Sequence, residues 1–347
     1  MMDWLSNQVK APGESFYRLA LTKQQQLTKP PGSLGELEDI AIRLAAMQQT
    51  TTPAIERIWV SVFAADHGVA EENVSAFPQI VTTEMVKNFV NDGAAVNVLS
   101  RYVHAQFEVI DVGLLKPVTL KKIIIDRAGD GTANFSKQAA MTEQQLKQAL
   151  LAGKAAVERA IMQKTQLFIG GEMGIANTTS ASAIACAITG LSVEQLTGAG
   201  TGLGSKEIQH KSQVIYNALS LHQQQLRSPL KVLQSLGGFE IAALVGAYVF
   251  AAQQGIAILI DGFISTVAAL LAIKINPQVQ LWCFFAHQSQ EKGHRLILEY
   301  LQAKPLLNLN MRLGEGSGAV IALPLLQMAC KLHNEMATFE QAKITTN

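Results

Sequence analysis

Five short apolar runs, separated by long stretches of helical character, most constrain how this chain folds. The runs lie at residues 58–65, 107–112, 167–169, 256–260 and 281–285. They are nearly continuous rather than alternating, which is typical of strands buried on both faces of a sheet. The stretches between them predict helices at 79–99, 142–164, 206–221 and 239–253. This alternation predicts an α/β fold, in which a mostly parallel sheet is flanked by helices in a three-layer, Rossmann-like arrangement.

Both ends of the chain have a different, helical character. Pro30-Pro31-Gly32 predicts a sharp turn, and Ser33 is followed three residues later by Glu36, the spacing of a capping box. Apolar residues then recur on one helix face, and the tail from Gly318 onward is helical again. We therefore predict a small helical domain built from residues 1–55 and 305–347, and a large α/β catalytic domain at 56–304.

Charge and cysteine content narrow the possible partners. The 347 residues include 28 Lys and Arg against 27 Asp and Glu. A nucleic-acid groove or an anionic membrane surface favours a basic excess, so small molecules or a second copy of the chain are the expected partners. The three cysteines are far apart and form no C-x-x-C pair, and the N-terminus lacks an apolar core of signal-peptide length. These features favour a cytoplasmic protein.

The segment 241–260 contains twenty residues without a charge, which is long enough to span a membrane. Gln253-Gln254-Gly255 interrupts it, and Asp261-Gly262 ends it. We therefore expect a buried helix, a turn and a buried strand, and no membrane span.

The segment 167–180 is the strongest indication of chemistry. It predicts a strand, a glycine-rich turn, the hydroxyls of Thr178, Thr179 and Ser180, and then a helix. Free amides at a helix start bind anions, and glycines let a phosphate approach the backbone. The alternative is an ordinary helix cap, but a cap needs only one hydroxyl. We therefore favour a phosphate site, and no Walker lysine follows to indicate a nucleoside triphosphate.

A second glycine-rich segment lies at 198–204. Its glycines recur at every second position and follow a predicted helix, so it does not match the G-x-G-x-x-G dinucleotide fingerprint. It is better suited to form a flexible backbone wall against a sugar phosphate. Lys211 on the next helix is either a cation for that phosphate or an ordinary surface lysine.

Several other residues are candidates for chemistry, each with a structural alternative. Glu315 lies between glycines near the C-terminus, where partial burial would raise its pKa and suit it to take a proton, unless it is an exposed turn residue. Asp66 and His67 end the first strand and are either functional or structural. Asp126 follows an apolar run in a weak resemblance to a phosphoribosyl-pyrophosphate loop. The histidines do not cluster at metal-ligand spacing, so no metal site is predicted.

Taken together, the chain resembles the nicotinate-nucleotide–dimethylbenzimidazole phosphoribosyltransferase family. The resemblance covers nearly the whole chain, in family order, through KPPGSLGELE at 29–38, ADHGV at 65–69, SAFPQIVTTEMV at 75–86, GGEMGIANTTSASA at 170–183, GAGTGL at 198–203, LGGFEIAALVGA at 236–247, DGFISTVAAL at 261–270 and LNLNMRLGEGSGA at 307–319. It implies a homodimer that transfers the 5-phosphoribosyl group of nicotinate mononucleotide to 5,6-dimethylbenzimidazole, without a cofactor or metal. The products are alpha-ribazole 5'-phosphate and nicotinate, in cobalamin lower-ligand synthesis.

The same resemblance assigns roles to individual residues. Glu315 corresponds to the catalytic base, and Glu172 to a second glutamate whose separate role stays open. The benzimidazole pocket maps to Ser75, Phe77 and Gln79. The phosphate and ribose contacts map to Gly174, Ile175, Ala176, Asn177, Thr178, Thr179, Gly200, Gly202, Leu203 and Lys211. Ala176 departs from the family, which often has glycine there, so a close backbone approach to phosphate would be slightly weakened.

This donor and acceptor make modest demands on the protein. Nicotinate already leaves from a pyridinium, so no acid has to protonate it. The attacking benzimidazole has a second nitrogen whose proton one carboxylate can take. Two other functions stay open at this point: a non-catalytic ribotide-binding or sensing protein of the same fold, and a nicotinamide-dependent oxidoreductase, which the broken glycine spacing disfavours.

Overall fold

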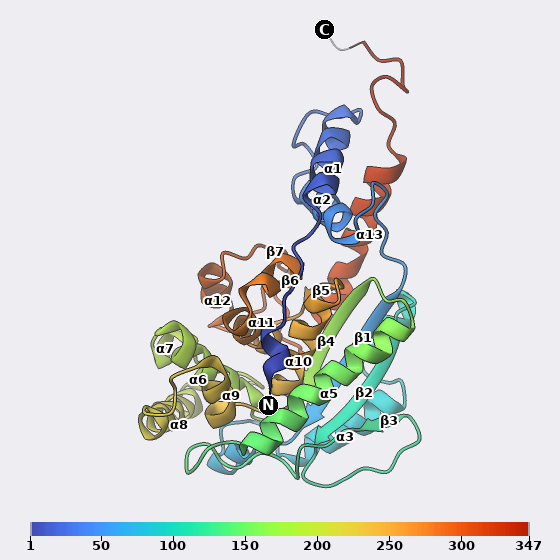
Figure 1. Cartoon of the computed structure of the whole chain (residues 1–347). Coiled ribbons are helices and arrows are strands. Elements are labelled where there is room, and N and C mark those ends of the chain that lie inside the picture. The colour runs from blue at the N-terminus through green and yellow to red at the C-terminus, as the bar shows by residue number, and fades with distance from the viewer. Residues whose placement is uncertain (1, 346–347) are drawn as a thin grey trace.

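The chain folds around a seven-stranded sheet in which all paired strands are parallel (Figure 1). The computed structural model describes residues 2–345. The strand order is β3-β2-β1-β4-β5-β6-β7. The strands are β1 Ile58–Ala65, β2 Gln106–Gly113, β3 Ile123–Ile125, β4 Leu167–Met173, β5 Ala257–Ile260, β6 Cys283–His287 and β7 Pro305–Leu307.

Helices cover both faces of the sheet, which completes three layers. The helices α5 and α10 pack together over one face, while α3, α4 and α13 lie against the other (Figure 1). The predicted α/β class is therefore confirmed. The helices are α1 Glu14–Gln26, α2 Glu36–Gln48, α3 Ile80–Val90, α4 Ala95–Tyr102, α5 Glu143–Met162, α6 Asn177–Thr189, α7 Val193–Leu196, α8 Ser205–His222, α9 Pro229–Leu236, α10 Phe239–Gln253, α11 Phe263–Ile275, α12 His294–Tyr300 and α13 Ser317–Glu335, with short 3₁₀ helices η1 Asp3–Ser6, η2 Gly68–Glu72 and η3 Pro277–Trp282.

Each of the five apolar runs contributes a largely buried strand. The run at 281–285 does so only in part, because Leu281 and Trp282 end the 3₁₀ helix η3 before β6 begins. Two short edge strands, β3 and β7, extend the sheet beyond the five that the sequence predicted. The helix predicted over 79–99 is divided into α3 and α4. The break falls at Asn91-Asp92-Gly93, where Asp92 has a left-handed backbone (φ +60°) that no helix tolerates.

The uncharged segment 241–260 forms most of α10, a turn and β5, all within the protein. Nearly every residue of α10 is buried, because the helix is enclosed between α5, α11 and the sheet. Within the part of the chain that the structure covers, no helix is long and apolar enough to cross a membrane.

At one end of the molecule, α1, α2 and α13 pack together (Figure 1). A β-bridge between Leu27 and Thr338 joins the two termini. The predicted capping role of Ser33 was wrong, because α2 begins after Gly35. Glu38 instead accepts a hydrogen bond from the Leu34 amide at 3.0 Å and forms an ion pair with Lys29 at 2.7 Å. The predicted domain boundaries at 1–55, 56–304 and 305–347 stay a prediction, although residues 305–307 belong to the sheet.

The strand order reverses direction between β1 and β4. The chain builds β1, β2 and β3 outward in one direction and then crosses to β4 on the other side of β1. Loops leaving β1 and β4 therefore diverge at this point. In open parallel sheets such a divergence, at the carboxyl ends of the strands, is where ligands bind.

Candidate active site

A cavity of about 290 Å³ opens at the carboxyl ends of β4 and β5. Segments distant in sequence meet around it, including four that the sequence analysis singled out. The polar and charged lining comes from Glu172, Asn177, Thr178, Thr201, Asp261, Ser265, Ser289, Glu291, Arg312 and Glu315, and the larger apolar lining from Phe77, Val81, Met85, Met173, Ile175, Phe263, Ile264 and Leu313.

Glu315 lies on one wall of this cavity and is buried, so the alternative of an exposed turn residue is excluded. Its backbone is left-handed (φ +68°), and so is that of Gly316 (φ +87°). Burial raises the pKa of Glu315 to about 7, and the nearby negative charge of Asp261 contributes in the same direction. A carboxyl group with such a pKa can take a proton near neutral pH.

Glu172 lies on the same cavity, at the end of β4. Its carboxylate accepts a hydrogen bond from the Asn177 side chain. Burial raises the pKa of Glu172 well above its usual range, and the charges of Glu240, Asp261 and Glu315 reinforce the shift. The hydrogen bond opposes that shift without reversing it.

Two glycines let the Glu172 and Glu315 segments approach each other. A side chain at Gly171 would collide with the backbone of Glu315, and one at Gly314 would collide with the Glu172 carboxylate. Gly171 lies inside β4, which continues to Met173, whereas the sequence predicted a turn directly after residue 169. The glycines flanking both glutamates are explained by this close packing.

The predicted phosphate segment forms the turn from β4 into α6. Gly174, Ile175, Asn177 and Thr178 line the cavity, whereas Ala176 and Thr179 are buried outside its lining. Some donors are already engaged: the Ile175 amide donates to Thr82 Oγ1 at 3.1 Å. The Asn177 amide donates to the Gly174 carbonyl at 3.1 Å. Ser180, which the sequence counted with the phosphate hydroxyls, donates to a carbonyl in the interior instead.

Lys211 is almost completely buried behind this turn, which excludes the surface-lysine alternative. Its ammonium group donates to Thr178 Oγ1 at 2.8 Å, and burial lowers the pKa of Lys211 to about 8. Gly200 lines the cavity close to this ammonium group. Gly202 and Leu203 lie farther along the loop, outside the lining, and their amides donate to the Ala199 carbonyl.

Of the three residues predicted to form the benzimidazole wall, only Phe77 lines the cavity, with 52% of its surface exposed. The Ser75 hydroxyl lies 3.0 Å from that of Thr201 and joins the two loops. The Gln79 amide donates to the His67 carbonyl at 3.0 Å and anchors the start of α3. Ser75 and Gln79 thus shape the loop behind Phe77.

Several lining residues were not singled out from the sequence. The apolar side chains Val81 and Met85 belong to the SAFPQIVTTEMV stretch, whose later positions were not considered individually. Asp261 and the following helix start belong to the quoted DGFISTVAAL stretch. Arg312, the cation on the lining, precedes Glu315 by three residues. The quoted stretches contained these residues, but only folding showed which side chains face the cavity.

Asp66 and His67 occupy structural positions beside the cavity. His67 Nε2 lies 2.7 Å from Glu240 Oε1, and both side chains are completely buried. The His67 ring packs under Gly174, where a side chain would collide with the carbonyl of Ala65. Asp66 Oδ2 accepts the Leu115 amide at 2.7 Å. Within the described range 2–345, no group of three His, Cys, Asp or Glu side chains is arranged to hold a metal ion.

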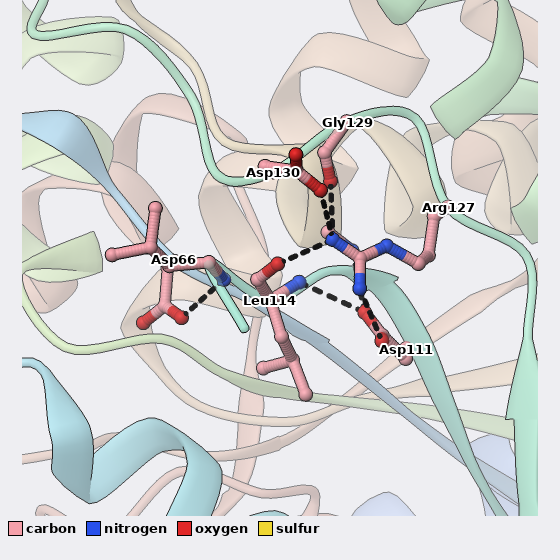
Figure 2. A network of polar contacts seen from close by, with 8 residues as sticks. Asp66, Asp111, Leu114, Arg127, Gly129 and Asp130 are labelled. Atoms are coloured by element: carbon pink, nitrogen blue, oxygen red, sulfur yellow. Dashed lines mark hydrogen bonds and ion pairs between the residues drawn. The ribbon is translucent and has the colours of Figure 1, made fainter. Parts of the chain in front are cut away.

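Arg127, within the weakly matching segment 123–132, is a structural brace. Figure 2 shows its guanidinium between the carboxylates of Asp111 and Asp130 and the carbonyls of Leu114 and Gly129. Asp111 also accepts the amides of Gly113 and Leu114, at 2.9 and 2.8 Å. This set of contacts, the Arg127 brace, fixes the backbone after β2, and no residue of 123–132 lines the cavity.

Comparison with known proteins identifies relatives over nearly the full chain. A family model described as a phosphoribosyltransferase matches residues 9–344. A nicotinate-nucleotide–dimethylbenzimidazole phosphoribosyltransferase of Pseudomonas fluorescens is 54% identical over 342 residues, covering 98% of this chain and 97% of the relative. One from Xanthomonas oryzae pv. oryzae is 52% identical, covering 99% of both chains. The crystal structure of the Thermus thermophilus enzyme of that name superposes with a TM-score of 0.91 at 40% identity, covering 96% of this chain and all of the other.

Proposed function

Because the chain belongs to the nicotinate-nucleotide–dimethylbenzimidazole phosphoribosyltransferase family, we propose that Glu315 is the general base of its reaction. The enzyme transfers the 5-phosphoribosyl group from nicotinate mononucleotide to 5,6-dimethylbenzimidazole. It gives alpha-ribazole 5'-phosphate and nicotinate, a step of cobalamin lower-ligand synthesis. The binding and oxidoreductase alternatives are set aside by this family membership.

The observation that carries the proposal is the buried carboxyl of Glu315 on the wall of the cavity, with its pKa raised to about 7. A base is most effective when its pKa lies near the working pH, because it is then both largely ionised and sufficiently basic. An exposed glutamate would be ionised at pH 7 but would take a proton from a ring nitrogen far less readily.

The proposed chemistry balances without a further reagent. One nitrogen of the benzimidazole attacks C1′ of the ribose and forms the new C–N bond. The bond from C1′ to the pyridinium nitrogen breaks, and its electron pair stays on nicotinate. The second benzimidazole nitrogen loses its proton to the Glu315 carboxylate. Attack opposite the leaving group inverts C1′, so that the product is the α-ribotide.

The lining of the cavity supports a flat acceptor next to this base. Phe77, Val81, Met85, Met173 and Ile264 supply an apolar surface suited to a methylated bicyclic ring. The same apolar surface favours the raised pKa of Glu315, because it excludes water from the carboxylate. We propose Phe77 as the ring contact, with Ser75 and Gln79 holding its loop.

For the donor, we propose that the phosphate lies at the turn from β4 into α6. The helix start offers a partial positive charge, and Thr178 offers a hydroxyl toward the cavity. Lys211 lies behind Thr178, and its ammonium group can polarise the Thr178 hydroxyl through their hydrogen bond. The same ammonium group lies close to Gly200, where the missing side chain leaves space for a direct contact with the phosphate. The other residues assigned by resemblance, from Gly174 to Thr179 and from Gly200 to Leu203, shape these two loops.

We propose that Glu172 orients the acceptor or the ribose in its protonated form. Burial raises its pKa well above the usual range, and the charges of three other carboxylates act in the same direction. A neutral carboxylic acid donates a hydrogen bond, which an ionised carboxylate cannot do.

We also propose that the enzyme is a homodimer that works in the cytoplasm. Three buried free cysteines agree with a reducing compartment.

The test of the base is Glu315→Gln. We expect turnover to fall by about two to four orders of magnitude, the range for loss of a general base. Purified variant and wild type are mixed with nicotinate mononucleotide and 5,6-dimethylbenzimidazole, and nicotinate and the α-ribotide are measured by chromatography and mass spectrometry. Glu335→Gln makes the same change at the exposed end of α13, outside the cavity, and should keep wild-type turnover. Turnover of Glu315→Gln within about threefold of wild type would exclude Glu315 as the base.

A further inference from the structure

We propose that Asp261 is the positioning residue of Glu315: it holds the Glu315 backbone in its left-handed conformation and places a negative charge beside the Glu315 carboxylate. The inference rests on the proposed role of Glu315 as the base. It assigns Asp261 a part in the reaction that its place on the cavity wall does not by itself establish.

The backbone contacts carry the first half of this inference. Asp261 follows directly after β5 and reaches the start of α13. Its Oδ2 accepts the Gly316 amide at 3.1 Å, and its Oδ1 accepts the Ala319 amide at 2.8 Å. One side chain thereby fixes the residue that follows Glu315 and the first turn of the helix behind it. Helix starts need such acceptors, because their amides have no partner within the helix.

Glu315 needs an external restraint because its conformation is unfavourable. A left-handed backbone costs a residue other than glycine roughly 1–2 kcal/mol. Such a conformation persists only where the surrounding structure fixes it. Asp261 acts from one side through the Gly316 amide, and the bare backbone of Gly171 packs against Glu315 from the other. Glu315 is thus clamped between the ends of β5 and β4.

The charge of Asp261 carries the second half. Both of its carboxylate oxygens accept N–H groups, and these hydrogen bonds favour the ionised form against the effect of burial, which raises the pKa of Asp261. Its charge is the second cause, after burial, of the raised pKa of Glu315. Other charged or titratable groups nearby are Glu172 and Arg312 on the same cavity lining, Glu240, which acts on Glu172, and His287 beside Asp261. His287 Nε2 lies 3.7 Å from Asp261 Oδ1.

The two halves predict a combined effect for Asp261→Asn. Asparagine keeps one acceptor oxygen, so one of the two amides loses its partner and Glu315 is less well held. The negative charge is lost as well, which lowers the pKa of Glu315. Because the base works in its ionised form, the fall in kcat/KM on the acid side should then begin at a lower pH than in the wild type.

The experiment compares wild type, Asp261→Asn and Asp111→Asn from pH 5 to 9. It measures kcat, KM for nicotinate mononucleotide, and kcat/KM for 5,6-dimethylbenzimidazole. Asp111 is a matched control, since it is equally buried and also accepts two backbone amides near a strand end, but lies outside the cavity lining. The acid limb of each profile is the fall in kcat/KM toward low pH. Protonation of 5,6-dimethylbenzimidazole contributes equally to the acid limb of every variant, so a difference between two acid limbs comes from a group of the enzyme.

For Asp261→Asn we expect kcat to fall roughly ten- to a hundred-fold, as expected for a displaced catalytic group, with KM for the donor within about threefold of wild type and an acid limb moved to lower pH. Asp111→Asn should keep the wild-type acid limb. An acid limb that stays in place in Asp261→Asn would overturn the proposal, whether or not kcat falls. If Asp261→Asn does not fold, Asp261→Ser, a smaller and equally neutral replacement, is measured against the same two criteria. Loss of activity in Glu315→Gln together with an unmoved limb in Asp261→Asn would reject this inference alone, while an active Glu315→Gln would reject the base itself.

Discussion

The Arg127 brace after β2 and the Glu315 segment before α13 use the same structural device with different charges. In each, a buried aspartate near a strand end accepts two backbone amides: Asp111 those of Gly113 and Leu114, and Asp261 those of Gly316 and Ala319. Burial is the largest cause of the raised pKa of both aspartates. The two aspartates differ, however, in the charged group that each one acts on.

At the brace, the guanidinium of Arg127 opposes the effect of burial on Asp111. At the cavity, Asp261 adds its own negative charge to the effect of burial on Glu315. No ion pair in the described residues joins Lys or Arg to Glu172, Asp261 or Glu315. At the brace, the buried carboxylate is paired with an arginine and fixes a loop, whereas the carboxylates of the cavity raise one another's pKa values.

The largest stability effect is expected at the brace. Arg127→Met should lower the free energy of unfolding by roughly 3 kcal/mol, because it leaves the buried Asp111 carboxylate and the Leu114 carbonyl without their partner. Urea denaturation at pH 7 measures this, and turnover of the folded variant should stay within about threefold of wild type.

Arg295→Met is the matched control for that change. Its ion pair with Glu299 is largely exposed, so its loss should cost less than about 0.5 kcal/mol. Equal destabilisation by both variants would mean that the Arg127 brace contributes no more than a surface pair. The comparison between the two regions would then fail.

At the cavity, removing the Glu315 carboxylate should raise the free energy of unfolding, whereas removing Arg127 should lower it. The pKa of Glu315 is about 7 in the folded protein and 4.5 in the reference state, so the folded state keeps a proton that the unfolded chain has already lost between these values. Stability contributed by this group is therefore present at low pH and lost as pH rises through about 7. Glu315→Gln lacks the titration and should gain on wild type above pH 7, by up to roughly 3 kcal/mol.

Denaturation of Glu315→Gln and wild type at pH 5 and pH 8 measures this gain, since the two should differ least at pH 5 and most at pH 8. Such an outcome would show an enzyme that tolerates lower stability to keep a basic carboxylate. A stability difference that does not change with pH would mean that Glu315 titrates alike in the folded and unfolded states.

The smallest effect concerns the phosphate turn. Ala176 has a left-handed backbone (φ +76°) that favours glycine. Ala176→Gly should therefore raise the free energy of unfolding by about 0.5–1 kcal/mol, net of the greater freedom of glycine in the unfolded chain. A shift of the thermal midpoint measures it. Ala160→Gly, in the regular helix α5, should instead destabilise. Destabilisation of similar size in both variants would contradict the strain at 176.

Much of the fold was predictable because burial leaves a direct record in the sequence. Strands enclosed by helices on both faces must be apolar throughout, so the runs at 58–65 and 256–260 indicated a parallel sheet without further help. The edge strands β3 and β7 were missed. Each has only three residues with partly exposed side chains, which is too short to show a hydrophobic pattern in the sequence. The Ser33 cap failed for a local reason: a spacing of residues does not fix the left-handed turn at Gly35 that starts the helix.

The site was predictable in outline and less so in detail. Partial burial and a raised pKa were one of the two alternatives that the sequence offered for Glu315, and the structure has the buried one. Phe77 lines the cavity as expected, while Ser75 and Gln79 bond to neighbouring loops. Lys211 was left undecided, since a lysine on a polar helix looks the same whether its side chain points outward or inward.

The sequence by itself determined the class of fold, the position of the strand-end segments and the residue types available for catalysis. Those properties depend on the hydrophobic pattern of neighbouring residues, because apolar side chains are buried away from water wherever the chain folds. Only the tertiary structure decided that Asp261, Glu172 and Glu315 share one cavity while Asp111 faces Arg127. The strength of a charge effect depends on distance and burial between residues far apart in the chain, and neither quantity exists until the chain has folded.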